Sequence, residues 1–423
     1  MSVLNWAAAQ VEASRIAVEP MWQQIANIRR YNHRRVLEAF RQVRVSEHHL
    51  IGTTGYGYND PSREVLEAIY ARIFNAEAAL VRPQIISGTH AINLCLKGIC
   101  RPGDEILSIT GAPYDTLRRI ISGPGRCLAD WGITYRELPL LPDGSCDIPA
   151  LQSAIGPKTR LVMLQRSRGY DIRPALSAEH IAQAAATIKN TAPHVVTFVD
   201  NCYGEFVEKH EPTYYPGVDL LAGSLIKNPG GTLAPSGGYI VGQSEFVSQV
   251  ADALTAPGLG NKVGPMLGVG RQLLQGLYLA PLFVAEAVCG AILAAHVFGE
   301  LGYCTLPNWH APRYDSVQTV ILEKPEAVLA VCRAVQSASP IDSTAVPIPD
   351  ELPGYTDPVI MAAGTFIQGA SSELSADGPM RPPYAVFLQG GTARDQMELA
   401  LEIALQNLAE AQLLPCPISL NQD

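Results

Sequence analysis

The sequence has 423 residues, of which 47% are hydrophobic and 17% are charged, and its formal net charge is −9 at pH 7. This length and composition predict one large and one smaller domain, and the negative charge argues against nucleic acid as the main partner. The nine cysteines include no Cys-x-x-Cys pair, so neither a zinc site nor a redox dithiol is predicted, and no metal ligand set is expected. With no basic-then-apolar leader at the N-terminus, we expect a reducing cytoplasm as the location.

The N-terminal segment, residues 1–50, is predicted to be helical. Its pattern is amphipathic to about residue 48, and the basic run at 29–35 is interpreted as a solvated face or a subunit contact. The stretch GTTGYGYNDPS, residues 52–62, is rich in Gly, Asn, Asp and Pro and is therefore predicted to be a loop. A helix is expected to follow from Arg63 to about Asn75.

Short apolar segments then alternate with helical segments, such as residues 177–190. Apolar runs interleaved with helices favour an α/β fold with a mainly parallel sheet that is covered on both faces. The expected strands are residues 104–110, 134–140, 159–165, 194–200 and 218–224. Residues 236–243 are expected to add one further strand, which could be antiparallel.

A long helical region is predicted over about 262–302. Its most apolar part, Leu277–Phe298, contains Pro281, Glu286 and His296, so it is interpreted as a buried helix and not as a membrane span. The composition then becomes rich in proline, and the chain closes with a predicted helix from Ala393 to about Leu414. We therefore expect a large domain over 51–304 and a smaller C-terminal α/β domain over 305–423.

Ligands of open α/β sheets bind beyond the carboxyl ends of the strands, and polar residues stand at several such places. Ser87, Gly88 and Thr89 begin an apolar helix, where free N–H groups and two hydroxyls could hold a phosphate. The alternative is that Ser87 or Thr89 only caps the helix. Tyr114 follows the next strand and could stack on a flat ring, although a tyrosine in a loop is more often there for packing.

Two charged residues end later strands. Asp200 closes one apolar run, and Lys227 follows the next run within GSLIKNPGG, three residues after Ser224. A buried carboxylate at a strand end needs a positive partner, unless it is a turn or cap residue. Pyridoxal 5′-phosphate requires a lysine for a Schiff base, an acid for its pyridine nitrogen, a stacking ring and a phosphate cradle. The sequence therefore predicts a pyridoxal-phosphate site.

The residues also resemble a known family. The blocks SGTHAI, QRSRGY, VDNCYGEF, AGSLIKNPGG and PYAVFLQGG, spread over about residues 50–395, are similar to those of fold-type I pyridoxal-phosphate enzymes of cysteine and methionine metabolism. The branch that they resemble is the methionine γ-lyase-like or aluminium-resistance branch. The resemblance implies an aminotransferase-like large domain with a smaller C-terminal domain.

The resemblance also implies roles for individual residues. It makes Lys227 the Schiff-base lysine and Asp200 the partner of the pyridine nitrogen. It gives Gly88, Thr89 and Ser224 to the phosphate, and Tyr114 to the cofactor ring as a stacking residue that can also act as an acid or base.

The family further implies a homodimer or homotetramer with shared active sites. In the wider family, a Tyr-x-Arg pair of a neighbouring subunit contacts the phosphate. This chain reads Tyr56-Gly57-Tyr58 at that place and lacks the arginine, so Tyr56 and Tyr58 are the expected contacts across the interface.

The activity that these features predict is carbon–sulfur bond cleavage in a sulfur-containing amino acid, by β- or γ-elimination. A planar, bidentate donor is required for the substrate carboxylate, which indicates an arginine, Arg381 first and Arg168 second. One alternative is a different pyridoxal-phosphate activity such as an aminotransferase. Another is a cofactor-binding stress or regulatory protein without turnover.

Overall fold

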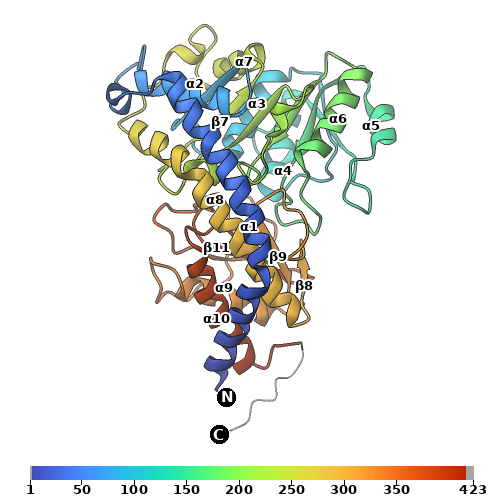
Figure 1. Cartoon of the computed structure of the whole chain (residues 1–423). Helices are drawn as coiled ribbons and strands as arrows, with labels where there is room; N and C mark the ends of the chain where they lie inside the picture. Colours follow the sequence, from blue (N-terminus) through green and yellow to red (C-terminus); the bar gives the residue numbers. More distant parts are fainter. Residues whose placement is uncertain (1, 416–423) are drawn as a thin grey trace.

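A computed structural model describes residues 2–415, and Figure 1 shows its arrangement. The upper part in that view is built on a seven-stranded sheet with the strand order β1-β7-β6-β5-β4-β2-β3. Its strands are β1 (Ala78–Arg82), β2 (Glu105–Ser108), β3 (Thr134–Glu137), β4 (Thr159–Gln165), β5 (Val196–Asp200), β6 (Leu220–Ser224) and β7 (Gly238–Gly242).

The five strands from β2 to β6 pair parallel with one another, whereas β7 pairs antiparallel with both β6 and β1. Successive residues of the strands point to two separate cores. Leu164, Val199 and Leu221 pack into one core, whereas Met163 and Phe198 pack into the other. Both faces of the sheet are therefore buried, as expected for a parallel sheet.

Helices cover these faces. They are α2 (Pro61–Ile73), α3 (Gly88–Ile99), α4 (Asp115–Ser122), α5 (Ile148–Ala154), α6 (Ala178–Thr191) and α7 (Ser244–Leu254). The start of α3 follows from local chemistry, because the Ser87 hydroxyl accepts a hydrogen bond from the His90 N–H at 3.0 Å and so caps the helix.

The lower part holds a five-stranded sheet in the order β10-β11-β12-β9-β8, in which all neighbours are antiparallel. The strands are β8 (Cys304–Leu306), β9 (Val317–Ile321), β10 (Val359–Ala362), β11 (Ser375–Pro379) and β12 (Ala385–Gln389). Helices α9 (Pro325–Ser337) and α10 (Arg394–Glu410) pack together on it.

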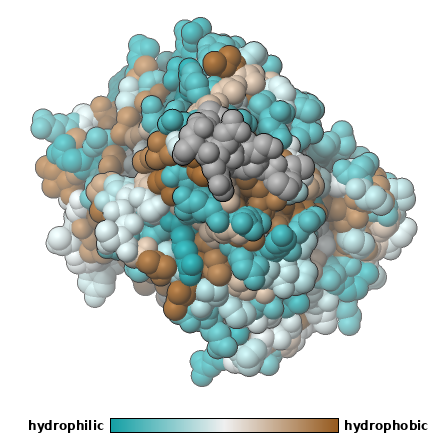
Figure 2. All heavy atoms as spheres, turned by 90° about the horizontal axis from the view of Figure 1, so that it is seen from below, coloured by the Kyte–Doolittle hydropathy of each residue, from teal (hydrophilic) through white to brown (hydrophobic). Residues whose placement is uncertain are grey.

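Two long helices connect the two parts. Helix α1 (Val3–Val43) runs the length of the molecule beside α8 (Gly270–Glu300), as Figure 1 shows. The Trp22 indole of α1 donates a hydrogen bond of 3.0 Å to the Cys289 carbonyl of α8. The view from below in Figure 2 shows hydrophobic residues interspersed with hydrophilic ones at this end of the molecule.

The structure confirms the α/β class with a mainly parallel sheet and a smaller sheet domain, and it revises several element bounds. Strand β1 was not predicted. Helix α2 begins at Pro61 and not at Arg63, since Asp60 caps it and proline suits the first turn. Helix α8 begins at Gly270 and not near 262, because Gly264 and Leu267 have φ angles of 104° and 53°, which a right-handed helix does not allow.

Helix α8 also has the length and hydropathy of a membrane span. However, 72% of its apolar window is buried within the protein, as in a core helix.

Candidate active site

A cavity of about 580 Å³ lies at the carboxyl ends of the parallel strands. Residues from both sheets line it. Those expected from the sequence are Ser87, Gly88, Thr89, Tyr114, Arg168, Asp200, Ser224, Lys227 and Arg381. The structure therefore brings together the predicted phosphate cradle, aromatic ring, acid and lysine, from elements far apart in the sequence.

The loop after β6 positions Lys227. Two positions of this loop, Gly230 and Gly231, must be glycine for steric reasons. A Cβ on Gly230 would lie 1.7 Å from the Leu225 carbonyl oxygen. A Cβ on Gly231, where φ is 50°, would lie 2.1 Å from the Gly276 carbonyl oxygen of α8. The chain therefore turns sharply against α8 directly after the lysine, and only glycine fits at either position.

The Lys227 amine lies over an aromatic ring. Its Nζ atom is 3.7 Å from the centroid of the Tyr203 ring, a distance typical of a cation–π contact. Burial acts to lower the pKa of Lys227, but the groups around it, Cys202, Tyr203 and Asp200, outweigh burial and raise that pKa well above its usual range.

Asp200 ends β5 and is 4% exposed. Its Oδ1 atom accepts a hydrogen bond of 3.1 Å from the Cys202 N–H. Burial raises the pKa of Asp200, and the positive charge of Lys227 acts in the opposite direction. Asp200 and Lys227 therefore line the same cavity and influence each other's pKa, although no direct salt bridge joins them among the described residues.

The start of α3 is packed closely against β6. A Cβ on Gly88 would lie 3.1 Å from the Cys202 Sγ atom and 3.2 Å from the Ser224 Cβ atom. Ser87 caps the helix, as one of the two interpretations expected, and it also lines the cavity, whereas its contact with a phosphate stays a prediction. The first turn of this helix therefore lies at the cavity together with the side chains of Thr89 and Ser224.

Tyr114 precedes α4 at the edge of the cavity. Burial raises the pKa of Tyr114 well above its usual range, and the nearby Asp200 adds to this effect. Its phenol is therefore protonated at neutral pH and can donate a proton or a hydrogen bond.

Sequence reasoning missed Tyr203, which belongs to the tight turn after β5. Its φ angle is 71°, unusual for a residue with a large side chain. Two bonds fix its backbone carbonyl, because the Asn228 amide donates to it at 2.9 Å and the Ser316 N–H donates at 3.1 Å. Asn228 directly follows Lys227, so the lysine loop and this turn are tied together.

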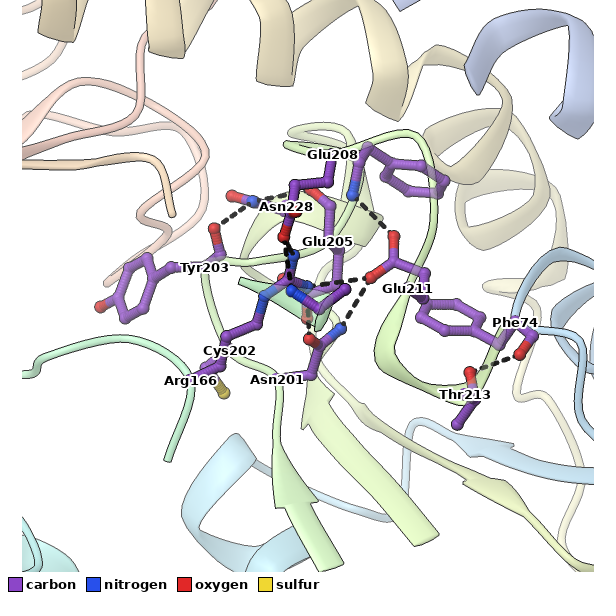
Figure 3. A network of polar contacts seen from close by, with 12 residues as sticks. Phe74, Arg166, Asn201, Cys202, Tyr203, Glu205, Glu208, Glu211, Thr213 and Asn228 are labelled. Carbon is purple, nitrogen blue, oxygen red and sulfur yellow. Dashed lines mark hydrogen bonds and ion pairs between the residues drawn. The ribbon is translucent and has the colours of Figure 1, made fainter. Parts of the chain in front are cut away.

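A buried polar network supports this turn from behind (Figure 3). Arg166 is fully buried and pairs with Glu208 at 2.5 Å and with Glu211 at 3.1 Å. Glu205 accepts a hydrogen bond of 2.7 Å from the Tyr239 hydroxyl, and its Oε2 atom has no partner among the described residues. Burial raises the pKa of Glu205 to about 8.

The Glu205 carboxyl predicts a specific pH dependence of stability. Its folded pKa lies above the unfolded value, so its contribution to stability is full at low pH and is lost as the pH rises through about 8. We expect the melting temperature of the parent protein to fall between about pH 5 and 8, as the pH rises from the unfolded to the folded pKa, and part of that fall to be absent in Glu205→Gln. Glu245→Gln, at an exposed position, is the control. If the melting temperature of Glu205→Gln declined with pH as much as that of the parent, the prediction would be contradicted.

The two predicted carboxylate-binding arginines differ in their free donors. Arg381 Nη1 contacts Asp357 at 2.8 Å and Asp115 at 3.8 Å, and its Nε and Nη2 atoms make no hydrogen bond within residues 2–415. Arg168 donates through Nη1 to the Leu306 carbonyl and through Nη2 to Asp315, so Nε is its only guanidinium nitrogen without a partner among the described residues. Arg381 thus keeps two donors for a bidentate contact.

Tyr56 and Tyr58 lie outside this cavity. They are 78% and 57% exposed, and their ring centroids are 5.8 Å apart. Contact of these rings with the cofactor site of a second subunit stays a prediction.

Comparison with known proteins gives a consistent result. A family model described as methionine gamma-lyase matches residues 7–409. An uncharacterized protein of Bacillus subtilis, YnbB, is 45% identical over 97% of this chain and 98% of its own. A Listeria monocytogenes structure, described as a candidate cystathionine beta-lyase involved in aluminium resistance, is 46% identical with a TM-score of 0.91 and covers 94% of this chain and 99% of its own. A Clostridium novyi carbon-sulfur lyase involved in aluminium resistance is 40% identical over 96% of both chains, also with a TM-score of 0.91.

Proposed function

The chain belongs to the methionine gamma-lyase family, and we propose that it is a pyridoxal-phosphate-dependent carbon–sulfur lyase that acts on a sulfur-containing amino acid. The observation that carries this proposal is the placement of Lys227 and Asp200 in one buried cavity, beside an anion-binding helix start. We place the protein in the cytoplasm, where its cysteine thiols stay reduced.

The residues of the cavity fit pyridoxal phosphate. Gly88 lets the first turn of α3 pack against Ser224 and Cys202, which brings the N–H groups of this turn beside Ser224, where they would hold a phosphate. Asp200 is buried in the same cavity as Lys227, where its carboxylate would suit a protonated ring nitrogen, and Tyr114 offers its ring to a flat ligand. When bound, the cofactor supplies an electron-accepting ring that stabilises negative charge at the Cα atom of an amino acid.

The side chains of the chain then take defined roles. Lys227 holds the cofactor, and its amine removes the Cα proton of the substrate once the substrate has replaced it. Tyr114 keeps its proton at neutral pH because burial raises its pKa, so it can donate that proton to the departing sulfur. Arg381 binds the substrate carboxylate through the donors that Asp357 leaves free.

A screen of sulfur-containing amino acids tests the function. In deuterated buffer the holoenzyme should exchange the Cα proton of its substrate and release thiol, ammonia and a 2-oxo acid in equal amounts. Pyruvate would indicate β-elimination and 2-oxobutyrate γ-elimination. Exchange accompanied by amine transfer to an added 2-oxo acid, without thiol, would instead indicate an aminotransferase. No exchange with any amino acid would indicate a binding protein without turnover.

A further inference from the structure

The Lys227 amine has an unusual set of neighbours. Within residues 2–415 it forms no salt bridge and no hydrogen bond, and its close contact is the face of the Tyr203 ring, 3.7 Å from the ring centroid. The other cation–π contacts among the described residues are longer and range from 4.4 to 5.9 Å. None of the residue roles in the proposed function involves this ring.

The turn that carries the ring is fixed to the loop that carries the lysine. Asn228, the residue after Lys227, donates an amide hydrogen bond of 2.9 Å to the Tyr203 carbonyl. Gly204, the residue after Tyr203, packs on the buried Arg166 side chain, where a Cβ would lie 2.5 Å from the Arg166 Cδ atom. In Figure 3 the Tyr203 ring points away from this network. The network therefore holds the backbone of the turn, and the ring faces the cavity.

The smaller sheet supports the ring itself. Tyr203 packs on a small apolar cluster formed by Val317 of β9 and by Ala385 and Phe387 of β12. Burial raises the pKa of Tyr203, and the charge of Lys227 acts in the opposite direction. The phenol therefore stays neutral at neutral pH, and the ring offers a π face to the amine and not a phenolate.

Two carboxylates act on the amine from a longer range. The charge of Lys227 lowers the pKa of Asp200 and of Asp377, which lies on β11, but neither forms a salt bridge with Lys227 among the described residues. The proposed function assigns Asp200 to the ring nitrogen. Asp377 accepts hydrogen bonds from the Tyr170 hydroxyl at 3.0 Å and from the Gln389 amide at 2.9 Å. The Tyr203 ring is therefore the direct partner that remains for the amine.

We propose that the Tyr203 ring is the docking place of the Lys227 ammonium group during turnover. In the proposed function, on which this inference rests, the freed amine takes the Cα proton of the substrate. The proton moves from Cα to Nζ, so a neutral amine becomes an ammonium ion in a half-buried position. The π face stabilises that charge. It also leaves no salt bridge or hydrogen bond that must break when the proton is passed on and the lysine returns to the cofactor.

Rings of nearly equal shape test the docking in the cofactor-free, full-length chain. Tyr203→Phe is compared with its mono-, di- and trifluorinated forms at position 203, because each fluorine weakens the negative π face. Traces of acetic anhydride label neutral amines only, and mass spectrometry compares the label on Lys227 with that on the exposed Lys262. At about pH 9 the Lys227 label should rise with each fluorine, by about 2–30-fold over the series, because less of the amine stays protonated.

The same series at Tyr355 is the matched control. Tyr355 also lines the cavity, but its ring lies 5.7 Å from that of Tyr170 and makes no cation–π contact with Lys227 in the described part of the chain. The Lys227 label should stay level in this series. The other titratable groups that interact with Lys227 are the same in both series, and they are Asp200, Cys202, Tyr114, Glu205 and Asp377.

The pH profile of the active enzyme gives a second measurement. With a substrate that releases thiol, the acidic limb of the kcat profile should move to lower pH along the Tyr203 series. We expect a shift of about 0.4–1.5 pH units, because the Lys227 amine must be neutral to take the proton. A limb that stays in place while the label changes would overturn the role in turnover.

The outcomes separate this inference from the proposed function. A level label along the Tyr203 series, or an equal rise along the Tyr355 series, overturns the docking. Thiol release together with a level label would remove the docking alone. A label that rises with fluorination, without thiol release from any amino acid, would keep the contact between amine and ring and remove the lyase activity.

Discussion

Replacing Lys227 with alanine should abolish covalent attachment of pyridoxal phosphate. Borohydride reduction of the parent holoprotein should fix the cofactor on one tryptic peptide, and mass spectrometry should locate it at Lys227. The variant should carry no label and should lose its visible absorbance band. Its turnover should fall by at least ~10²–10⁴-fold, because the amine that removes the Cα proton is missing.

Lys97→Ala is the matched control, since Lys97 lies outside the cavity and its amine contacts the Trp131 ring at 4.6 Å. The control should keep the label and the activity. A label on Lys97, Lys189 or Lys262 in the parent would show that another lysine anchors the cofactor. Far-ultraviolet circular dichroism of Lys227→Ala separates loss of attachment from loss of fold.

The part of the site that could be predicted from the sequence lies at strand ends and helix starts. Parallel strands place their carboxyl ends at one edge, so residues that follow successive apolar runs meet in space. Asp200, Ser224 and Lys227 obey this rule directly, because β5 and β6 are neighbours in the sheet. The Ser87 cap could be predicted for a similar reason. The first N–H groups of a helix have no partner within the helix, and the Ser87 hydroxyl accepts a hydrogen bond from one of them.

The rest of the site depends on contacts between segments that are distant in the sequence, and local sequence patterns do not predict such contacts. Tyr203 reaches Lys227 only because its turn adopts a φ of 71°, held by Asn228 and Ser316 from distant segments. Asp377 lies in the cavity because the register of β11 against β12 sets it opposite Phe387. Strand β1 was overlooked for a similar reason, since its partner β7 follows it by more than a hundred residues.

Asp200→Asn should preserve cofactor binding but should remove most of the turnover. Asparagine has nearly the same shape and still accepts a hydrogen bond from the Cys202 N–H, so we expect little change in the fold. It carries no negative charge, however, and therefore no longer favours a proton on the pyridine nitrogen. Removing a preorganised charge of this kind typically lowers turnover by about 10²–10³-fold. Cα deuterium exchange should fall by the same factor, because it reports proton removal before the sulfur departs.

Asp219→Asn is not a suitable control for this change, because Asp219 pairs with Lys189 at 2.5 Å and supports the sheet. Asp171→Asn is suitable, since it removes the same charge from an exposed position at the cavity rim. The control should retain parental exchange and cofactor content. If Asp200→Asn exchanges the Cα proton nearly as fast as the parent, the carboxylate does not act on the ring nitrogen. Its role would then be limited to its electrostatic interaction with Lys227, and the melting temperature would change while the exchange rate would not.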